Sequence, residues 1–282
     1  LQAGIYCCIP EDDSKGDAAR AEDYARRHQV PKWYSDAAQL IHDPDVNAIY
    51  IATPPSSHET YALEVMAAGK PVYVEKPMSL NYGSAKRMAD AAAANDVKLS
   101  VAHYRRGWPL FNKIKEMLHD GTIGTVRSVE IAFDRLPLTA EELADVKKAW
   151  RVDPAISGGG LFHDLAPHQL DILYWLFGDA KEIEGTSKNT GGHYAADDTV
   201  KGHILFANGI EFSGKWDFNA AGHRDHCGIS GSNGRIRFSF FSSTDVELTV
   251  NERISILHFD PLEHVQQPMI GKVVQYFLGK GI

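Results

Sequence analysis

The chain has 282 residues, of which 44% are hydrophobic and 23% are charged, as in ordinary globular proteins. The formal net charge is −8, from 29 Lys and Arg against 37 Asp and Glu, without a basic tail or stripe. These features argue against nucleic acid and membranes as main partners, and no apolar run approaches the roughly 20 residues that a membrane-spanning helix needs.

The three cysteines are Cys7, Cys8 and Cys227. Their spacing gives neither a disulfide framework nor a CxxC zinc pattern. We therefore expect a reducing compartment, the cytoplasm. The length suggests one large or two medium domains.

The first hundred residues alternate strand and helix patterns. Short apolar runs predict strands at 3–9, 46–52, 71–74 and 98–103. Helices are predicted at 17–28, from Asp36, from a cap at Ser56 or Ser57 to Ala68, and at 84–95. Strands separated by helices of this length indicate a parallel, doubly wound sheet with right-handed crossovers.

The pattern changes after Tyr104. Helices are predicted at 109–119, 161–177 and 267–278, and residues 135–150 look like a polar loop. Strands are predicted at 126–133, 181–187, 199–206, 210–216, 226–230, 235–240, 246–250 and 254–259. We expect a meander that forms an open, mostly antiparallel sheet with helices on one face. Alternating Phe, Ile and Trp positions are expected to make the other face apolar.

The segment Glu75-Lys76-Pro77 follows the short apolar strand predicted at 71–74. Open α/β sheets bind ligands at the carboxyl ends of their strands, so this charged pair stands where a ligand site is expected. Partial burial there would lower the pKa of Lys76 into a range that is useful for proton chemistry. The alternative is a strand-end lysine in solvent.

A second candidate is the segment from Ala52 to His58, which follows a buried strand and opens a helix. Its hydroxyl, its two prolines and the free N–H groups of the helix form a rigid polar lip that suits an anionic or ribose-bearing ligand. Taken alone, a proline-stiffened turn with Ser57 as a helix cap is the favoured interpretation.

The third candidate is the run of glycines from Gly158 to Gly160 and the helix that follows it. Asp164 and His168 are four residues apart and share a helical face, with Asp171 nearly on it. A carboxylate beside an imidazole raises the imidazole pKa, which would give an acid/base pair near neutral pH. A structural i,i+4 contact is an alternative. A metal site is less favoured, because no further ligand cluster stands out.

These three motifs, in this order, resemble those of the Gfo/Idh/MocA oxidoreductases. The motifs are Ala-Thr-Pro-Pro-x-x-His, Ala-Gly-Lys-Pro-Val-x-Val-Glu-Lys-Pro and Gly-Gly-Gly-x-x-x-Asp-x-x-x-His-x-x-Asp, and the resemblance runs from about Asp17 to Gly279. It implies a Rossmann domain (1–103) and a substrate-binding and oligomerisation domain (104–282). It also implies hydride exchange between NAD or NADP and a carbinol carbon of a sugar or polyol, in a homodimer or homotetramer that associates through the C-terminal sheet.

The resemblance also assigns residues. The family's motif lysine, aspartate and histidine are matched by Lys76, Asp164 and His168. The implied cofactor contacts are Ala52, Thr53, Pro54, His58, Glu75, Lys76, Trp150 and Arg151. The implied substrate contacts are Tyr104, Arg105, Asp164 and His168, with no metal. The segment from His103 to Arg106 leaves the last Rossmann strand, so its residues either reach the substrate or serve as a structural hinge.

The sequence departs from the family at its start. The family opens with a strand and a G-x-G-x-x-G turn that holds the cofactor pyrophosphate, and no such motif occurs in this sequence. Glu11 could imitate the ribose-binding acid, although a solvated loop residue is the favoured interpretation. We expect residues 1–282 alone to bind NAD(H) and NADP(H) weakly. A non-catalytic sugar-binding or scaffold relative is the alternative, and the intact Lys76, Asp164 and His168 weigh against it.

Overall fold

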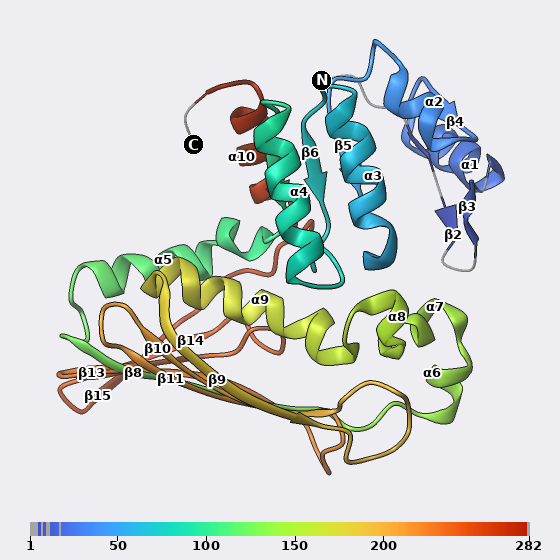
Figure 1. Cartoon of the computed structure of the whole chain (residues 1–282). Coiled ribbons are helices and arrows are strands. Elements are labelled where there is room, and N and C mark those ends of the chain that lie inside the picture. Colours follow the sequence, from blue (N-terminus) through green and yellow to red (C-terminus); the bar gives the residue numbers. More distant parts are fainter. Residues whose placement is uncertain (1–4, 7, 10–11, 17, 281–282) are drawn as a thin grey trace.

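The computed structural model describes residues 5–6, 8–9, 12–16 and 18–280 (Figure 1). The N-terminal part contains the elements β1 Ile5–Tyr6, β2 Cys8–Ile9, β3 Asp12–Gly16, α1 Ala18–His28, β4 Trp33–Tyr34, α2 Ala37–His42, β5 Ile49–Ile51, α3 Pro55–Ala67, β6 Val72–Val74, α4 Tyr82–Ala94 and β7 Leu99–Val101. The predicted alternation of strands and helices is confirmed.

The strands β5, β6 and β7 form a parallel sheet in that order. All three residues of the central strand β6 are buried, which explains its continuous apolar run. The helices α3 and α4 pack beside each other, and an ion pair from Arg87 to Glu59 joins them. The three strands point the same way, so their carboxyl ends meet at one edge of the sheet.

Two local predictions in this part need correction. The helix α3 begins at Pro55, with Pro54 at the cap position, and not at a serine cap. The hydroxyl of Ser57 lies inside the first turn, where it donates to the Pro54 carbonyl oxygen at 3.0 Å. The strand predicted at 3–9 is described only as β1 and β2, since residues 3, 4 and 7 lie outside the described residues.

The C-terminal part is larger. Its helices are η1 Tyr104–Gly107, α5 Pro109–His119, α6 Ala140–Ala144, α7 Val146–Ala149, η2 Trp150–Val152, α8 Pro154–Ser157, α9 Gly160–Phe177 and α10 Gln267–Phe277. Its strands are β8 Val126–Asp134, β9 Ala180–Lys188, β10 Thr199–Phe206, β11 Glu211–Asp217, β12 Arg224–Gly231, β13 Gly234–Phe238, β14 Val246–Val250 and β15 Arg253–Leu257. The loop predicted at 135–150 is wrong. Side-chain caps at Thr139 and Asp145 start two short helices there.

These eight strands form one open sheet in the order β15-β14-β13-β12-β8-β11-β10-β9. The strand β8 lies in the middle, antiparallel to β12 and parallel to β11. The sheet is therefore mostly antiparallel, as predicted, but it is not a simple meander, because its central strand comes from before α9.

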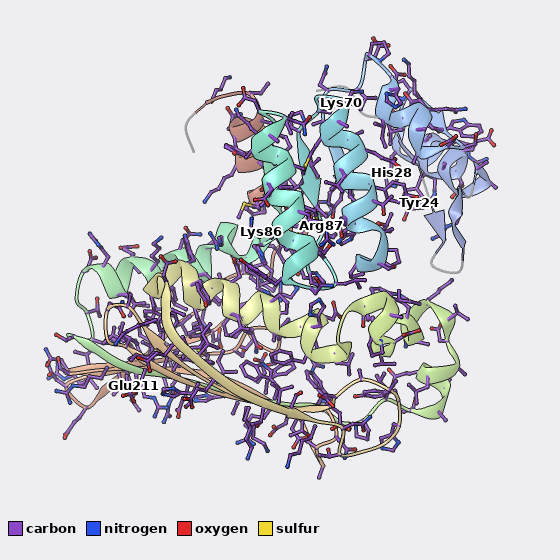
Figure 2. All side chains as sticks on the ribbon, viewed as in Figure 1. Tyr24, His28, Lys70, Lys86, Arg87 and Glu211 are labelled. Atoms are coloured by element: carbon purple, nitrogen blue, oxygen red, sulfur yellow. The ribbon has the colours of Figure 1, made fainter. Side chains whose placement is uncertain are left out.

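The helices α5 and α9 cover one face of this sheet (Figure 1). The side chains drawn in Figure 2 fill the layer between helices and sheet. The large apolar residues of the central strands point into that layer, among them Ile131, Phe212 and Trp216. The other face carries charged groups such as Glu130, whose carboxylate pairs with Arg235. The predicted Phe and Trp residues therefore do not line the uncovered face, and its large exposed isoleucines, Ile254 and Ile256, lie on the edge strand β15.

The C-terminal helix α10 returns to the N-terminal sheet. Its Val273 packs against Tyr73 and Ala102 in a small buried cluster. Lys98, just before β7, donates to the carbonyl oxygen of Tyr276 at 2.5 Å. The last helix of the chain thus covers the β6–β7 side of the Rossmann sheet (Figure 1).

A pair of Ile-to-Ala substitutions tests which face of the large sheet is the core. Ile131, on the central strand, is 3% exposed, whereas Ile254, on the edge strand β15, is 66% exposed. We expect Ile131→Ala to lower the free energy of unfolding by about 2–5 kcal/mol and Ile254→Ala by less than about 0.5 kcal/mol. Denaturant titration measures both, and equal losses would contradict the assignment of faces.

Candidate functional site

Polar residues stand at the carboxyl ends of all three strands of the Rossmann sheet. Thr53 follows β5, Glu75 and Lys76 follow β6, and His103 follows β7. The N-terminal half of α9 faces this edge, because Lys76 reaches Asp164 on that helix. The site thus lies between the two parts of the chain.

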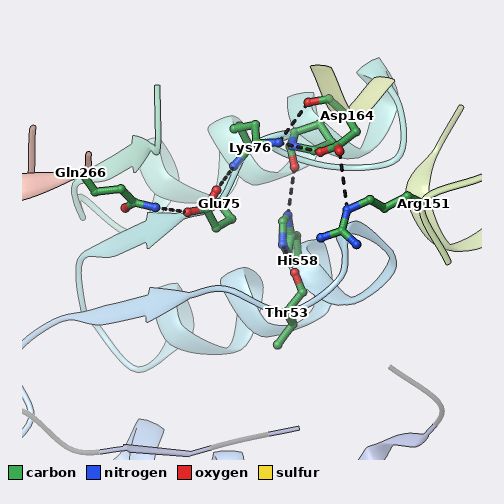
Figure 3. A network of polar contacts seen from close by, with 8 residues as sticks. Thr53, His58, Glu75, Lys76, Arg151, Asp164 and Gln266 are labelled. Atoms are coloured by element: carbon green, nitrogen blue, oxygen red, sulfur yellow. Dashed lines mark hydrogen bonds and ion pairs between the residues drawn. The ribbon is translucent and has the colours of Figure 1, made fainter. Parts of the chain in front are cut away.

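The ion pair between Lys76 and Asp164 is the centre of the site (Figure 3). The Lys76 ammonium lies 2.6 Å from Oδ1 of Asp164 and also donates to the Asp164 backbone carbonyl oxygen at 3.0 Å. Both side chains are largely shielded, with exposed fractions of 13% and 17%. The Nε of Arg151 stands 3.6 Å from the other carboxylate oxygen. Asp164 is therefore held by two cations.

This pairing corrects the predicted contact between Asp164 and His168. Among the interactions of the described residues, the Asp164 carboxylate pairs with Lys76 and Arg151, and Nδ1 of His168 is buried without a hydrogen-bond partner. Burial, with the positive charges of Lys76 and Arg105 and the nearby His103, lowers the pKa of His168 to about 2. The imidazole is thus neutral, and its pKa is not raised toward neutral pH as the sequence predicted.

The surroundings of His168 are aromatic. The ring of Tyr104 meets it edge-on with 5.1 Å between centroids, and Phe241 does so at 5.9 Å. Tyr104 therefore lies beside His168, and its predicted contact with substrate stays a prediction. The guanidinium of its neighbour Arg105 donates to the Phe240 carbonyl oxygen at 2.5 Å. That group also packs on the ring of Phe241 at 4.6 Å.

Asp171, on the next turn of α9, belongs to a separate cluster. Its carboxylate accepts two hydrogen bonds from Arg106, at 2.9 and 2.5 Å. Nδ1 of His103 lies 3.7 Å from the same carboxylate. Burial lowers the pKa of His103. His103 stands at the end of β7, at this edge of the sheet. The sequence left its role open between a structural hinge and a substrate contact.

His58, which the resemblance assigns as a cofactor contact, is buried and lies between the ends of β5 and β6. The side chain is 1% exposed. Its Nε2 lies 2.7 Å from the Thr53 carbonyl oxygen, and its Nδ1 lies 3.0 Å from the Pro77 carbonyl oxygen (Figure 3). Both nitrogens therefore already face backbone groups.

The remaining predicted cofactor residues are Glu75, Trp150, Arg151, Ala52 and Pro54. Glu75 accepts hydrogen bonds from the Tyr50 hydroxyl and from Nε2 of Gln266, which precedes α10. The guanidinium of Arg151 stacks over the ring of Trp150 at 4.5 Å. Ala52 and Pro54 flank Thr53 at the end of β5 and are left without an assigned contact.

The glycine turn lets α9 approach the Rossmann part closely. Gly158 has a φ of +93°, and a Cβ there would lie 2.8 Å from the Leu80 carbonyl oxygen. Gly160 has a φ of +73°, and a Cβ would lie 2.5 Å from the Cβ of Ala196. Next to this turn, Nε2 of His163 contacts the Ser79 carbonyl oxygen at 3.0 Å. A side chain at Gly158 would push α9, and with it Asp164, away from Lys76, whereas one at Gly160 would collide with Ala196 in the loop before β10.

Sequence reasoning missed a pocket beside this turn. It has a volume of about 460 Å³ and is lined by Pro154, Gly158, Gly159, Phe162, His163, Ser187, Ala195, Ala196, Asp197 and Val200. Sequence analysis also gave no role to Asp198. This residue is buried, and its carboxylate accepts from the backbone N–H groups of Thr190 and Gly191. A buried acidic residue in a polar loop leaves no periodic signal by which it could have been found.

Two kinds of feature are absent from the described part of the chain. No group of three or more His, Cys, Asp or Glu side chains there is arranged to hold a metal ion. None of its helices has the length and apolar character needed to cross a bilayer. Glu11, the candidate ribose-binding acid, lies outside the described residues.

Two family models match the chain. One, described as an oxidoreductase family with an NAD-binding Rossmann fold, matches residues 14–103. The other, described as a GFO/IDH/MocA C-terminal domain, matches residues 111–237. Together they cover both parts of the structure.

The chain is also similar to individual oxidoreductases and dehydrogenases. The chain is 46% identical to Oxidoreductase P35 of Formosa agariphila over 257 residues, which are 91% of this chain and 78% of that protein. It is 30% identical to trans-1,2-dihydrobenzene-1,2-diol dehydrogenase of Oryctolagus cuniculus over 84% of this chain and 69% of that protein. The fold matches levoglucosan dehydrogenase in complex with NADH and levoglucosan with a TM-score of 0.81, at 22% identity over 94% of this chain and 80% of that one.

The neutral His168 predicts a pH dependence of stability. Its pKa is about 2 in the folded chain and about 6.5 when unfolded, so the unfolded state binds more protons between these values. Stability from this group is complete above pH 6.5 and is lost as the pH falls toward 2. From pH 7 to 5 we expect the wild type to lose about 2 kcal/mol more than His168→Phe.

Denaturant titration at both pH values checks this difference. The control is His119→Gln, which changes an exposed histidine on α5 and is expected to keep the wild-type pH dependence. Equal pH dependence of His168→Phe and the wild type would contradict the buried, neutral imidazole.

Proposed function

Because the chain belongs to the GFO/IDH/MocA family of oxidoreductases, we propose that it is an NAD(P)-dependent dehydrogenase or reductase acting on a CH–OH group. The substrate class is a sugar, a polyol or a related diol, in line with the substrates in the names of two relatives. The observation that carries the proposal is the shielded Lys76–Asp164 pair close to a buried, neutral His168 whose Nδ1 lacks a partner.

The residues at the strand ends suit a nicotinamide cofactor. Thr53, Pro54 and Glu75 stand at the carboxyl ends of β5 and β6, where open α/β sheets bind nucleotides. Trp150 and Arg151 would lie on the opposite side of the site from these strand ends. NAD or NADP would supply hydride transfer, and the protein would position it. The unpaired Nδ1 of His168 is a buried polar atom that a bound hydroxyl could satisfy.

In this proposal the proton chemistry is divided between two side chains. The neutral imidazole of His168 accepts the proton of the substrate hydroxyl during oxidation and returns one during reduction. The Lys76 ammonium donates a hydrogen bond to the same oxygen and stabilises the negative charge that develops on it. Asp164 keeps the ammonium in place through the 2.6 Å contact.

The lowered pKa of His168 sets its protonation state in the apoprotein. An imidazole with a pKa of about 2 is unprotonated throughout the neutral range, but it is also a weak base, since proton transfer is most efficient when the pKa lies near the operating pH. Its protonated form is scarce in the apoprotein, which disfavours carbonyl reduction unless the bound ligands raise this pKa.

We propose that the chain assembles as a homodimer or homotetramer through the large sheet. The uncovered face of this sheet carries ion pairs such as Arg235–Glu130 and Arg237–Glu247. The large exposed apolar residues of the sheet lie on the edge strands, namely Ile183, Ile254 and Ile256. The contact would therefore combine ion pairs with apolar edges. Light scattering at micromolar concentration measures the assembly, and a monomer would contradict it.

Two substitutions test the catalytic assignment in the protein expressed from its complete reading frame. We expect His168→Ala to lower kcat by roughly two to four orders of magnitude, because the proton acceptor is lost. Lys76→Met keeps most of the side-chain volume and is expected to lower kcat by at least about 100-fold, because the charge facing the developing oxyanion is lost. Absorbance of the reduced nicotinamide measures both rates.

The matched control is Lys86→Met, which removes a lysine that is 56% exposed on α4 (Figure 2). Its kcat is expected to equal that of the wild type. Unchanged kcat in Lys76→Met would refute the role of Lys76. An absence of cofactor binding in the wild type would favour the alternative, a non-catalytic sugar-binding or scaffold relative.

A further inference from the structure

The strand ends that carry the site are joined by a buried histidine. His58 lies in the first turn of α3, one residue after Ser57, and its side chain is 1% exposed. Nε2 contacts the Thr53 carbonyl oxygen at 2.7 Å. Nδ1 contacts the carbonyl oxygens of Pro77 at 3.0 Å and of Met78 at 3.3 Å. The imidazole therefore spans from the segment after β5 to the segment after β6 (Figure 3).

Each contacted carbonyl lies just beyond a strand, where the sheet supplies no partner. Thr53 is two residues past the end of β5, and Pro77 is three residues past the end of β6. The neutral imidazole carries one N–H, and with that hydrogen on Nδ1 the ring donates to the Pro77 carbonyl oxygen. A buried carbonyl oxygen without a donor is costly, so this bond stabilises the segment after β6. Because Lys76 directly precedes Pro77, the position of the Pro77 carbonyl constrains the path of the Lys76 backbone.

These contacts leave no ring nitrogen for a ligand. Both nitrogens of His58 already face protein oxygens, which are acceptors only. Burial also lowers the pKa of His58, although the three backbone carbonyls oppose that shift. A buried ring that is held on both sides is suited to fixing its surroundings and not to touching the reacting atoms.

The geometry points to His58 as a positioning residue that fixes the strand-end segment of β6 through the Pro77 carbonyl and so keeps the Lys76 ammonium on Asp164. The consequence for catalysis rests on the proposed function, whereas the consequence for Lys76 does not. The residue acts through Lys76, and it is distinct from the cofactor contact that the sequence motif predicts.

Three substitutions separate the two halves of the contact. His58→Phe keeps a ring of similar shape without donors. The amide nitrogen of His58→Asn reaches the place of Nδ1, so this variant keeps a donor for Pro77. The amide nitrogen of His58→Gln reaches the place of Nε2 and keeps a donor for Thr53. Asn208→Ala is the control, because it removes a side-chain bond to a backbone carbonyl, that of Phe177, at the end of α9 away from the site.

The first readout needs no activity. An amine-acetylating reagent is applied to the apoprotein, and peptide mass spectrometry follows Lys76 against Lys86 as an internal reference. Lys76 is 13% exposed and ion-paired, whereas Lys86 is 56% exposed. We expect His58→Phe and His58→Gln to raise the relative labelling of Lys76 severalfold, and His58→Asn and Asn208→Ala to leave it near the wild-type value. Unchanged labelling of Lys76 in His58→Phe would overturn the proposal.

The second readout is kinetic and uses the protein expressed from its complete reading frame. We expect His58→Phe to lower kcat by about 10- to 100-fold, with cofactor Kd within about threefold of the wild type and with partial recovery in His58→Asn. Weaker cofactor binding with an unchanged kcat would overturn the proposal in favour of a cofactor contact. A loss of thermal stability with unchanged kcat would overturn it in favour of a purely structural role. If the wild type turns over no sugar, polyol or diol, the proposed function fails, while the labelling result still decides whether His58 positions Lys76.

Discussion

The ion pair between Lys76 and Asp164 is the interaction on which the site depends, because it joins a Rossmann strand end to a helix of the second part across 88 residues of sequence. Removing two charges from water is unfavourable, so a shielded pair persists only with good geometry and further hydrogen bonds. The Lys76 ammonium has a second acceptor in the Asp164 backbone, and the carboxylate has a second cation in Arg151. Gly158, with its positive φ, allows the close approach of α9 to the Rossmann part that this geometry requires.

The distribution of charge around this pair determines the state of the neighbouring imidazole. The carboxylates Asp164 and Asp171 are engaged by cations, so neither is left to stabilise a protonated His168. Burial and the charges of Lys76 and Arg105 then favour the neutral ring. The arrangement places a fixed positive charge and a neutral base near one another, which are complementary roles for a reaction in which a hydroxyl loses a proton and its oxygen passes through partial negative charge.

Local patterns predicted the elements well where a single period dominates. The amphipathic α5 begins at Pro109 and ends at His119 as its sequence indicates, and the strands β10 and β14 were predicted with their observed bounds. The place of β8 in the sheet could not be predicted, since strand order follows from long-range pairing. The helix period correctly predicted that Asp164 and His168 share one face of a helix. The Asp164 carboxylate nevertheless pairs with Lys76, which comes from another part of the chain. The partners of His58 are likewise carbonyl groups, which carry no sequence signal.

The most direct test of this account is a double-mutant cycle of Lys76→Met and Asp164→Asn on kcat/KM. If the two side chains act as one unit, either single substitution should remove most of the effect of the pair. The double variant should then lose far less than the product of the two single losses, with a coupling free energy of about 1–3 kcal/mol. Additive losses would show that Lys76 and Asp164 act independently, and they would contradict the central role of the ion pair.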